Sequence, residues 1–270
     1  VQRPNDTDLM LRLVSALIET NAIDDARTQL DRVEQLVTQS ADAVFYAGRI
    51  SFARGQIAEA VAFFERAIEI NPQEPQYFGY AAWSAMLAGN LGQARSLAQA
   101  GLQLDASLGD AYWIRGEVAL RSGLVRDAAR DLERAAQLSP RRAEIFEALG
   151  RCYDQTNRLN DAIRVTNRAL ELQPDRADWL YRLGRLQLDA RQNAATEASV
   201  SRAALLGETL APGPYWLADA HRIWGDMLRG RGQRDGGIEH YRRFLALASD
   251  GDVNRRDVEE MMLEWGQDVD

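Results

Sequence analysis

The feature that most constrains this chain is a 34-residue period in its small and turn-forming residues. Counted from the start of each period, positions 8 and 20 are small, and position 15 is mostly Gly or Asn. Small residues let two helix backbones approach closely, while Gly or Asn suits the left-handed turn that ends a helix. A fixed period of this length is typical of repeat architectures. Position 8 is Val14, Gly48, Ala82, Gly116, Gly150, Gly184 and Gly225, position 20 is Ala26, Ala60, Ala94, Ala128, Ala162, Thr196 and Gly237, and position 15 is Asn21, Gly55, Gly89, Gly123, Asn157, Arg191 and Gly232.

The period that begins at Ala143 has the clearest internal pattern. Its apolar and small residues follow helical spacing, break at Asn157, resume, and end at Pro174. This pattern predicts two helices joined by a short turn, and the short turn makes the two helices antiparallel. The other periods share the pattern, so the chain is predicted to be all-α. Arg191 is the exception at position 15, where a left-handed residue is expected.

This skeleton resembles the tetratricopeptide repeat family, whose pattern is an aromatic residue or Leu, Leu-Gly, Tyr, then Ala, Phe, Ala and Pro. In 143–176 it is carried by Phe146, Leu149-Gly150, Tyr153, Ala162, Ala169 and Pro174. The resemblance covers nearly the whole chain and implies a right-handed superhelical α-solenoid. It also implies that the first helix of each repeat lines a concave groove. The family's signature residues pack helices together, so they indicate the fold and do not name a partner.

We therefore expect one solenoid domain over residues 1–270. Seven repeats, an insertion at 211–217 rich in Pro and Gly, and a C-terminal capping helix at 252–266 account for its length. In the capping helix, one apolar stripe on a polar background is what the open end of a solenoid needs. The repeats are expected at 7–40, 41–74, 75–108, 109–142, 143–176, 177–210 and 218–251.

Composition restricts the classes of partner and site. The net charge of −8 and the pI of about 5.0 argue against nucleic acid and against anionic membrane surfaces. No apolar run is long enough to span a membrane, and no secretory signal is evident. The single cysteine, Cys152, permits a reducing compartment. We expect a soluble segment of the cytoplasm or the periplasm, excised from a longer chain because it begins with Val.

Catalytic and metal-binding constellations are not recognisable in the sequence. His221 and His240 are the only histidines, and neither is spaced with Cys152 as a nucleophile and base. No HxxxH or CxxC pattern suggests a metal site. The glycine-rich stretch 230–237 coincides with an expected turn between helices and follows no strand, so a phosphate-binding loop is not predicted. We predict that the chain is not an enzyme and needs no cofactor or metal.

The predicted groove face has an apolar half and a charged half. In the first four repeats, large apolar residues stand where a merely soluble surface would carry charge, and we take them as the partner-binding groove. From the fifth repeat onward, mixed charges that can pair with one another replace them. The alternative is that the apolar residues pack between repeats. The groove residues are Leu11, Phe45, Phe52, Trp83, Met86, Trp113 and Leu120, with Trp83 and Trp113 expected to approach one another.

Position 2 is acidic in six of the seven repeats. One interpretation is an acidic ladder that favours basic flanks on a partner. The other is that each carboxylate stabilises the positive end of its own helix. The sequence thus predicts an interaction scaffold that binds an extended peptide or a helix of another protein in its groove. Two alternatives are open: a module for self-association or docking within a longer chain, and the regulatory array of a larger enzyme.

Overall fold

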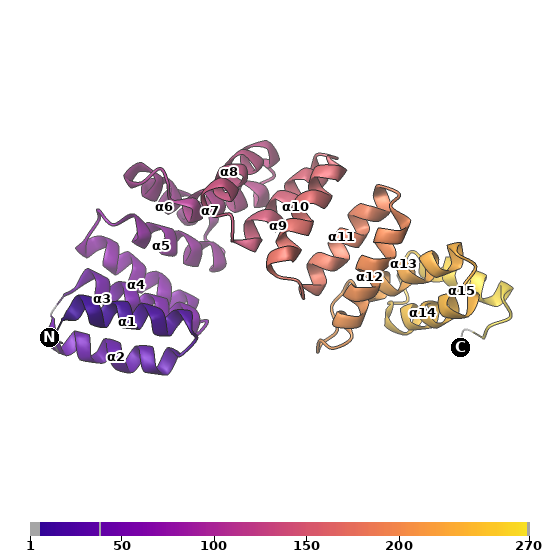
Figure 1. The fold of residues 1–270 in the computed structure, drawn as a ribbon, viewed down its shortest axis with the longest axis horizontal. Helices are drawn as coiled ribbons and strands as arrows, with labels where there is room; N and C mark the ends of the chain where they lie inside the picture. The colour runs from indigo at the N-terminus through magenta and orange to yellow at the C-terminus, as the bar shows by residue number, and fades with distance from the viewer. Residues whose placement is uncertain (1–5, 38, 269–270) are drawn as a thin grey trace. The chain divides into compact units, whose positions relative to one another are not determined.

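The computed structural model describes residues 6–37 and 39–268, and in them it contains fifteen α-helices and no strand. The all-α prediction is confirmed (Figure 1). None of the helices in the described part is long and apolar enough to cross a membrane. In chain order the helices are α1 (Thr7–Glu19), α2 (Ile23–Leu36), α3 (Ala41–Ala53), α4 (Ile57–Ile70), α5 (Pro75–Leu87), α6 (Leu91–Leu104), α7 (Gly109–Arg121), α8 (Val125–Leu138), α9 (Ala143–Gln155), α10 (Leu159–Leu172), α11 (Ala177–Asp189), α12 (Asn193–Gly207), α13 (Leu217–Gly230), α14 (Arg234–Leu247) and α15 (Arg255–Glu264).

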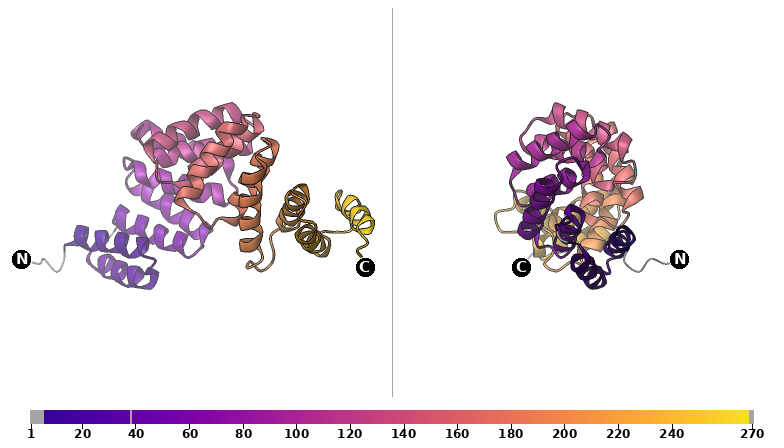
Figure 2. Two further views of the ribbon diagram at one scale, coloured as in Figure 1. Left: turned by 45° about the vertical axis from the view of Figure 1, so that its right-hand side comes forward. Right: turned by 90° about the vertical axis from the view of Figure 1, so that its left-hand side faces the viewer.

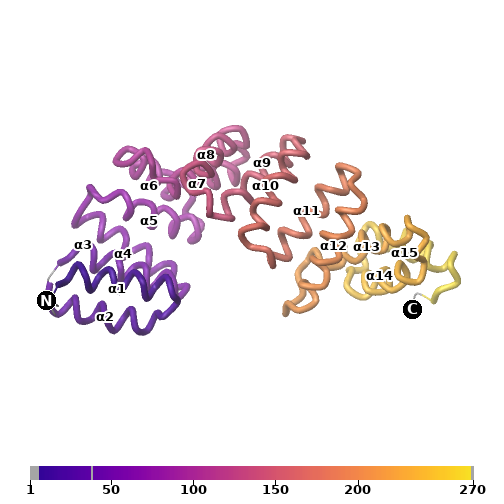
Figure 3. Tube along the Cα trace, in the orientation of Figure 1, coloured from indigo at the N-terminus to yellow at the C-terminus, as the bar shows by residue number. Residues whose placement is uncertain are grey.

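The helices form consecutive pairs joined by short turns, which Figure 3 traces along the chain. The turn residue at position 15 has positive φ throughout, at 75° in Gly55 and 82° in Gly89, for example. Arg191 adopts the same conformation, with a φ of 57°, although it is not a glycine. The following amide, Gln192 N, donates to Gln187 O at 2.8 Å and closes the turn as in the other pairs. The repeat geometry therefore overrides the preference of this residue.

Within each pair the helices meet closely at position 8. In α11, a methyl group on Gly184 would lie 2.5 Å from Val200 Cγ2 on α12, closer than any ordinary contact. In this pair an added methyl group would push against α12, since protein cores do not absorb an added methyl group without strain. The recurrence of Gly and Ala in the sequence thus has a direct packing cause.

The chain divides into two compact units, Val1–Pro140 and Arg141–Asp270, and each is described separately. In the first unit the cores lie between successive helix pairs, around Leu30 and Ile50 and around Phe64 and Tyr77. In the second unit one core surrounds Leu180 and joins α9 to α13, and another surrounds Tyr241 and joins α14 to α15. Within each unit, neighbouring pairs stack on one another (Figure 2). A single domain over the whole chain stays a prediction.

The insertion between the sixth and seventh pairs forms turns and bends over 208–216. The sequence predicts the insertion at 211–217, and the next helix, α13, begins at Leu217 with Trp216 at its N-cap. Trp216 is buried, at 5% exposed, whereas the adjacent Tyr215 is 95% exposed. The insertion thus places one aromatic ring in the core and its neighbour in solvent.

The C-terminal helix α15 begins at Arg255, three residues later than the sequence suggested. Asp252 does not cap it, because the Asp252 carboxylate accepts the amide of Asn254 in a turn before the helix, at 2.8 Å. Val258 and Met262 of α15 are buried against Tyr241 and its neighbours on α14. The apolar stripe of α15 therefore covers the second helix of the last pair.

Candidate protein-interaction surfaces

A row of aromatic rings crosses the first helices of the first unit. Phe52 on α3 lies 4.6 Å from Trp83 on α5, measured between ring centroids. Trp83 in turn meets Trp113 on α7 edge to face, at 5.4 Å and 78°. Such tilted and edge-to-face pairs are favourable arrangements for aromatic rings. The expected approach of the two tryptophans is observed.

Burial separates the seven predicted groove residues into two groups. Phe52 and Trp83 are partly exposed. The others are less than a tenth exposed, because each packs in the core between helices of this unit. These buried residues are Leu11, Phe45, Met86, Trp113 and Leu120.

Phe45 shows why the buried group lies where it does. Its ring stacks on Tyr77 of the next first helix at 4.8 Å and tilts against Phe64 of its own pair at 5.6 Å. Phe45 is position 5 of its repeat, counted from Ala41. This position faces both the other helix of its pair and the next repeat, so a large residue there fills the core. Only Phe52 and Trp83 among the seven offer ring surface to another molecule.

Arg49 lies on the same face and was not singled out from the sequence. Its guanidinium lies over the rings of Tyr46 and Tyr80, at 5.5 and 5.3 Å, and donates to Ser15 Oγ at 2.9 Å. It is only 8% exposed, so the side chain is fixed between two aromatic rings. A signal was present, because Arg49 occupies position 9, the same position as Trp83.

The acids at position 2 make contacts between repeats as well as at helix ends. Asp42 accepts a hydrogen bond from the hydroxyl of Tyr77, and Asp219 accepts one from Tyr181 at 2.7 Å. Burial and the neighbouring carboxylate raise the pKa of Tyr77, and the same two causes raise the pKa of Tyr181 to about 12. The carboxylates of Asp42 and Asp219 therefore already accept hydrogen bonds within the fold.

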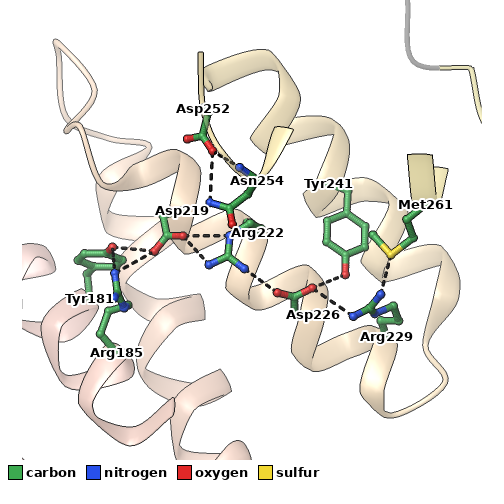
Figure 4. A network of polar contacts seen from close by, with 10 residues as sticks. All are labelled: Tyr181, Arg185, Asp219, Arg222, Asp226, Arg229, Tyr241, Asp252, Asn254 and Met261. Carbon is green, nitrogen blue, oxygen red and sulfur yellow. Dashed lines mark hydrogen bonds and ion pairs between the residues drawn. The ribbon is translucent and has the colours of Figure 1, made fainter. Parts of the chain in front are cut away.

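The charged face of the second unit is a continuous network of ion pairs and hydrogen bonds (Figure 4). Arg222 on α13 lies between two carboxylates and binds Asp219 at 2.7 Å and Asp226 at 2.8 Å. Asp226 also accepts the hydroxyl of Tyr241 at 2.7 Å, and Asp219 faces Arg185 at 3.5 Å. The predicted pairing of charges is observed for these residues, although not for Asp154 and Asp189 of the same charged half, and the network links α11, α13 and α14.

A cavity of about 490 Å³ opens beside this network in the second unit. Its walls come from α9, α11 and the segment just before α13, so it lies on the face formed by first helices. Aromatic, acidic and basic side chains all contribute. The lining residues are Asp154, Asp178, Tyr181, Arg182, Arg185, Leu186, Asp189, Tyr215 and Trp216.

The two histidines come together on another face of the second unit. His221 is 5% exposed, and its Nδ1 lies 3.2 Å from Nδ1 of His240, while its Nε2 lies 3.0 Å from Glu208 Oε1. Glu208 is also paired with Arg243, and His240 stacks on Trp224 at 3.7 Å. Burial is the main cause that lowers the pKa of both histidines.

These contacts make the histidines part of the packing between α12, α13 and α14. Within the described residues, no group of three or more His, Cys, Asp or Glu side chains is placed to hold a metal ion. Cys152 is buried, so its thiol is not accessible from solvent. That the chain needs no metal or cofactor stays a prediction.

Two family models, both described as tetratricopeptide repeat, match residues 11–75 and 119–186. The chain is a tetratricopeptide repeat protein. The match agrees with the observed helix pairs and with their small residues at the close contacts. No curated protein matches the chain significantly.

Solved structures of low sequence identity share the fold. One is the APC/C hetero-tetramer Cut9-Hcn1, with a TM-score of 0.72 and 18% identity over 97% of this chain and 50% of that one. This tetratricopeptide repeat chain thus spans about half of that structure's chain. Pseudomonas aeruginosa pilF gives a TM-score of 0.68 and 17% identity, covering 82% of this chain and 97% of that one. YrrB, described as a TPR protein with an unusual peptide-binding site, gives 0.60 and 18%, covering 74% and 97%.

Proposed function

We propose that this chain is an interaction scaffold that binds an extended segment or a helix of another protein on the first-helix face of its first unit. Phe52 and Trp83 supply the contact surface. The observation that carries the proposal is a pair of partly exposed aromatic rings, 4.6 Å apart, on a floor of buried ones. The family as a whole supports a binding role, and YrrB is described as peptide-binding.

The buried residues contribute by holding this pair in place. Trp113 supports Trp83 from α7, and a ring that is already fixed loses little conformational entropy when a partner binds. Tryptophan and other aromatic residues dominate binding energy at protein interfaces because they remove a large apolar area from water. The partner is therefore expected to present apolar side chains at this surface.

The flanks of the partner follow from charge. The chain carries a net charge of −8, and Asp8 at position 2 of the first repeat is exposed. Basic residues beside the apolar ones would be attracted to such a surface at low ionic strength. We propose a partner segment that is apolar with basic flanks.

The test is selection of peptides against the intact chain, followed by affinity measurements with variants. Peptides from a random library should be enriched in apolar residues, and Phe52→Ala and Trp83→Ala should each weaken them by about tenfold or more. Phe63→Ala is the matched control, because Phe63 is also a partly exposed aromatic residue of the first unit but lies on a second helix. It should leave affinity unchanged.

Two results would contradict the proposal. One is the selection of peptides whose affinity is the same for wild type and for the Phe52→Ala/Trp83→Ala double variant. The other is a loss of affinity in the double variant that Phe63→Ala reproduces, since general destabilisation would then explain it. Circular dichroism of all variants separates loss of fold from loss of contact.

Self-association is a second candidate function, favoured by one observation. Leu9 and Leu13 lie one turn apart on α1 and are 59% and 47% exposed. Adjacent exposed leucines on one helix face are a candidate for contact with a second copy. Static light scattering over a range of concentrations should then show mass increasing for wild type and not for Leu9→Glu/Leu13→Glu. A constant monomer mass for both would exclude this candidate.

A further inference from the structure

The cavity of the second unit has an exposed aromatic ring at its rim. Tyr215 is 95% exposed, although the segment that carries it is anchored on both sides. Next to it, Trp216 is buried and stacks on Tyr181 at 5.2 Å and 15°, and Leu217 N donates to Pro214 O at 3.0 Å. In the described part of the chain, no other ring and no cation lies on Tyr215. A tyrosine ring that is fixed at its base and bare on its faces is a surface for a ligand.

The cations already in the cavity are engaged. Arg185 donates to the hydroxyl of Tyr181 at 3.2 Å and lies 3.5 Å from Asp219. Arg182 lies 3.5 Å from Glu147. Each guanidinium thus faces a carboxylate that is not part of the cavity lining, and neither needs an acid from inside it.

Two carboxylates of the lining remain available. The side-chain carboxylates of Asp154 on α9 and Asp189 on α11 make no hydrogen bond or ion pair with any described residue. Asp189 has only a longer-range electrostatic interaction with Arg185. The third acid, Asp178, is bound by Arg176 at 2.8 Å. The cavity therefore offers negative charge beside a bare aromatic ring, and both features suit a cation.

Stacking of a guanidinium on an aromatic ring already occurs within the second unit. Arg176 lies over the ring of Trp179 at 4.1 Å, and Arg158 lies over Tyr153 at 4.2 Å. A planar guanidinium stacks on a ring and at the same time donates from its edge to a carboxylate, which a compact ammonium group cannot do as well.

We infer that this cavity is a subsite for an arginine side chain of a partner protein, with Tyr215 stacking on the guanidinium and Asp154 or Asp189 accepting its hydrogen bonds. The subsite is not part of the repeat pattern, because Tyr215 and Trp216 come from the insertion that interrupts the 34-residue period. The inference rests on the proposed function only in taking the ligand from a protein. It uses none of the residues of the first unit, so either proposal can fail alone.

The test uses two short capped peptides, acetyl-Gly-Arg-Gly-amide and the same peptide with citrulline in place of arginine. Citrulline keeps the shape of arginine and removes its charge. The intact chain is titrated while the indole N–H of Trp216 is followed by NMR, with Trp216→Phe used to assign the signal. The arginine peptide should shift this signal and should bind at least about tenfold more tightly than the citrulline peptide, as expected for hydrogen bonds to a charged group.

Variants then separate the two contributions. Tyr215→Ala should weaken the arginine peptide by about two- to fivefold, which is the range of an exposed cation–π contact. Asp154→Asn/Asp189→Asn should reduce the preference for arginine over citrulline to near one. Asp250→Asn is the matched control, because Asp250 is exposed and lies outside the cavity. It should change neither value, nor should Phe52→Ala.

The inference is overturned if the arginine peptide causes no shift at millimolar concentration, or if the citrulline peptide binds equally well. It is also overturned if Tyr215→Ala and the double Asn variant both bind as wild type does. Because Tyr215, Asp154 and Asp189 are outside the buried core, the melting temperatures of these variants should match that of Asp250→Asn, so a change in binding is not a change in folding.

Discussion

Gly225 provides a sharp test of the packing between helix pairs. It lies in the middle of α13, where glycine normally costs stability relative to alanine, by about 1 kcal/mol. On helix propensity alone, Gly225→Ala should stabilise the protein. The structure predicts the opposite, because a methyl group at this position would lie 2.7 Å from Cε1 of Tyr241 and 2.9 Å from its Cδ1.

The size of the effect follows from how firmly the Tyr241 ring is held. To reach ordinary contact at 3.4 Å, the ring would have to retreat from 2.7 Å, by roughly 0.7 Å. Tyr241 is fully buried, and its hydroxyl donates to Asp226 at 2.7 Å. Overpacking typically costs about 1–3 kcal/mol, and weakening a hydrogen bond to a charged acceptor adds about 1–2 kcal/mol. After the propensity gain of about 1 kcal/mol is subtracted, we expect a net loss of about 1–4 kcal/mol.

Gly230 is the matched control on the same helix. A methyl group there would meet nothing within 4 Å, so Gly230→Ala should be neutral or stabilising by up to about 1 kcal/mol. Because repeat arrays unfold in parts, hydrogen exchange over α13 and α14 is the appropriate measurement, with thermal melting beside it. Gly225→Ala should speed exchange in both helices, and Gly230→Ala should not.

A double-mutant cycle makes the reasoning refutable. In a Tyr241→Leu background the rigid ring is gone, so adding Gly225→Ala should cost much less than it does in wild type. If Gly225→Ala slows exchange, or costs the same with and without the Tyr241 ring, then the close contact at position 8 is not what selects glycine there.

Two further predictions concern the second unit. Burial is the main cause that lowers the pKa values of His221 and His240. Below about pH 6.5 the unfolded chain therefore binds protons that the folded chain does not. The free energy of unfolding should be highest above about pH 7 and should fall as the pH drops through the folded pKa values. Melting temperatures measured between pH 7.5 and 5.5 should show this fall, and His221→Gln/His240→Gln should reduce it. Greater stability at acidic pH would contradict the lowered pKa values of the two histidines. Truncation after Gly251 removes α15 and exposes Tyr241 and Phe244, so it should lower the melting temperature and promote aggregation, whereas unchanged melting and solubility would refute the capping role.

Much of the fold was predictable because one physical requirement recurs at fixed spacing. Close approach of two helices demands small residues, and a short turn demands a left-handed residue, so the period alone placed the helix starts at Ala41 and Ala143 where the structure has them. Arg191 shows that the identity of one residue does not decide the backbone conformation at its position. Its side chain argues against the left-handed conformation, yet the surrounding repeat imposes it.

The site was less predictable, because helical spacing gives the direction of a side chain and not what covers it. Phe45 and Trp113 share position 5 with charged residues of later repeats, and the pattern could not tell whether a large apolar group there meets solvent or the next helix. The answer depends on Tyr77 and Trp83, which lie about one repeat away in the sequence. Burial between repeats is a property of residue pairs, and a single sequence does not reveal which pairs form.

The difference between positions 5 and 9 gives the predicted groove a physical meaning. A residue at position 5, such as Phe45, is enclosed by its own pair and the next, so changing it acts on folding. A residue at position 9, such as Trp83, keeps part of its ring exposed, so changing it can act on binding. The same position carries Arg49 and Arg185, whose guanidiniums are held by neighbouring rings or hydroxyls. Arg49 is buried, whereas Trp83 and Arg185 keep part of their surface exposed. Specificity for a partner should therefore depend on the exposed residues at position 9, while buried residues at position 5 such as Phe45 keep the repeats together.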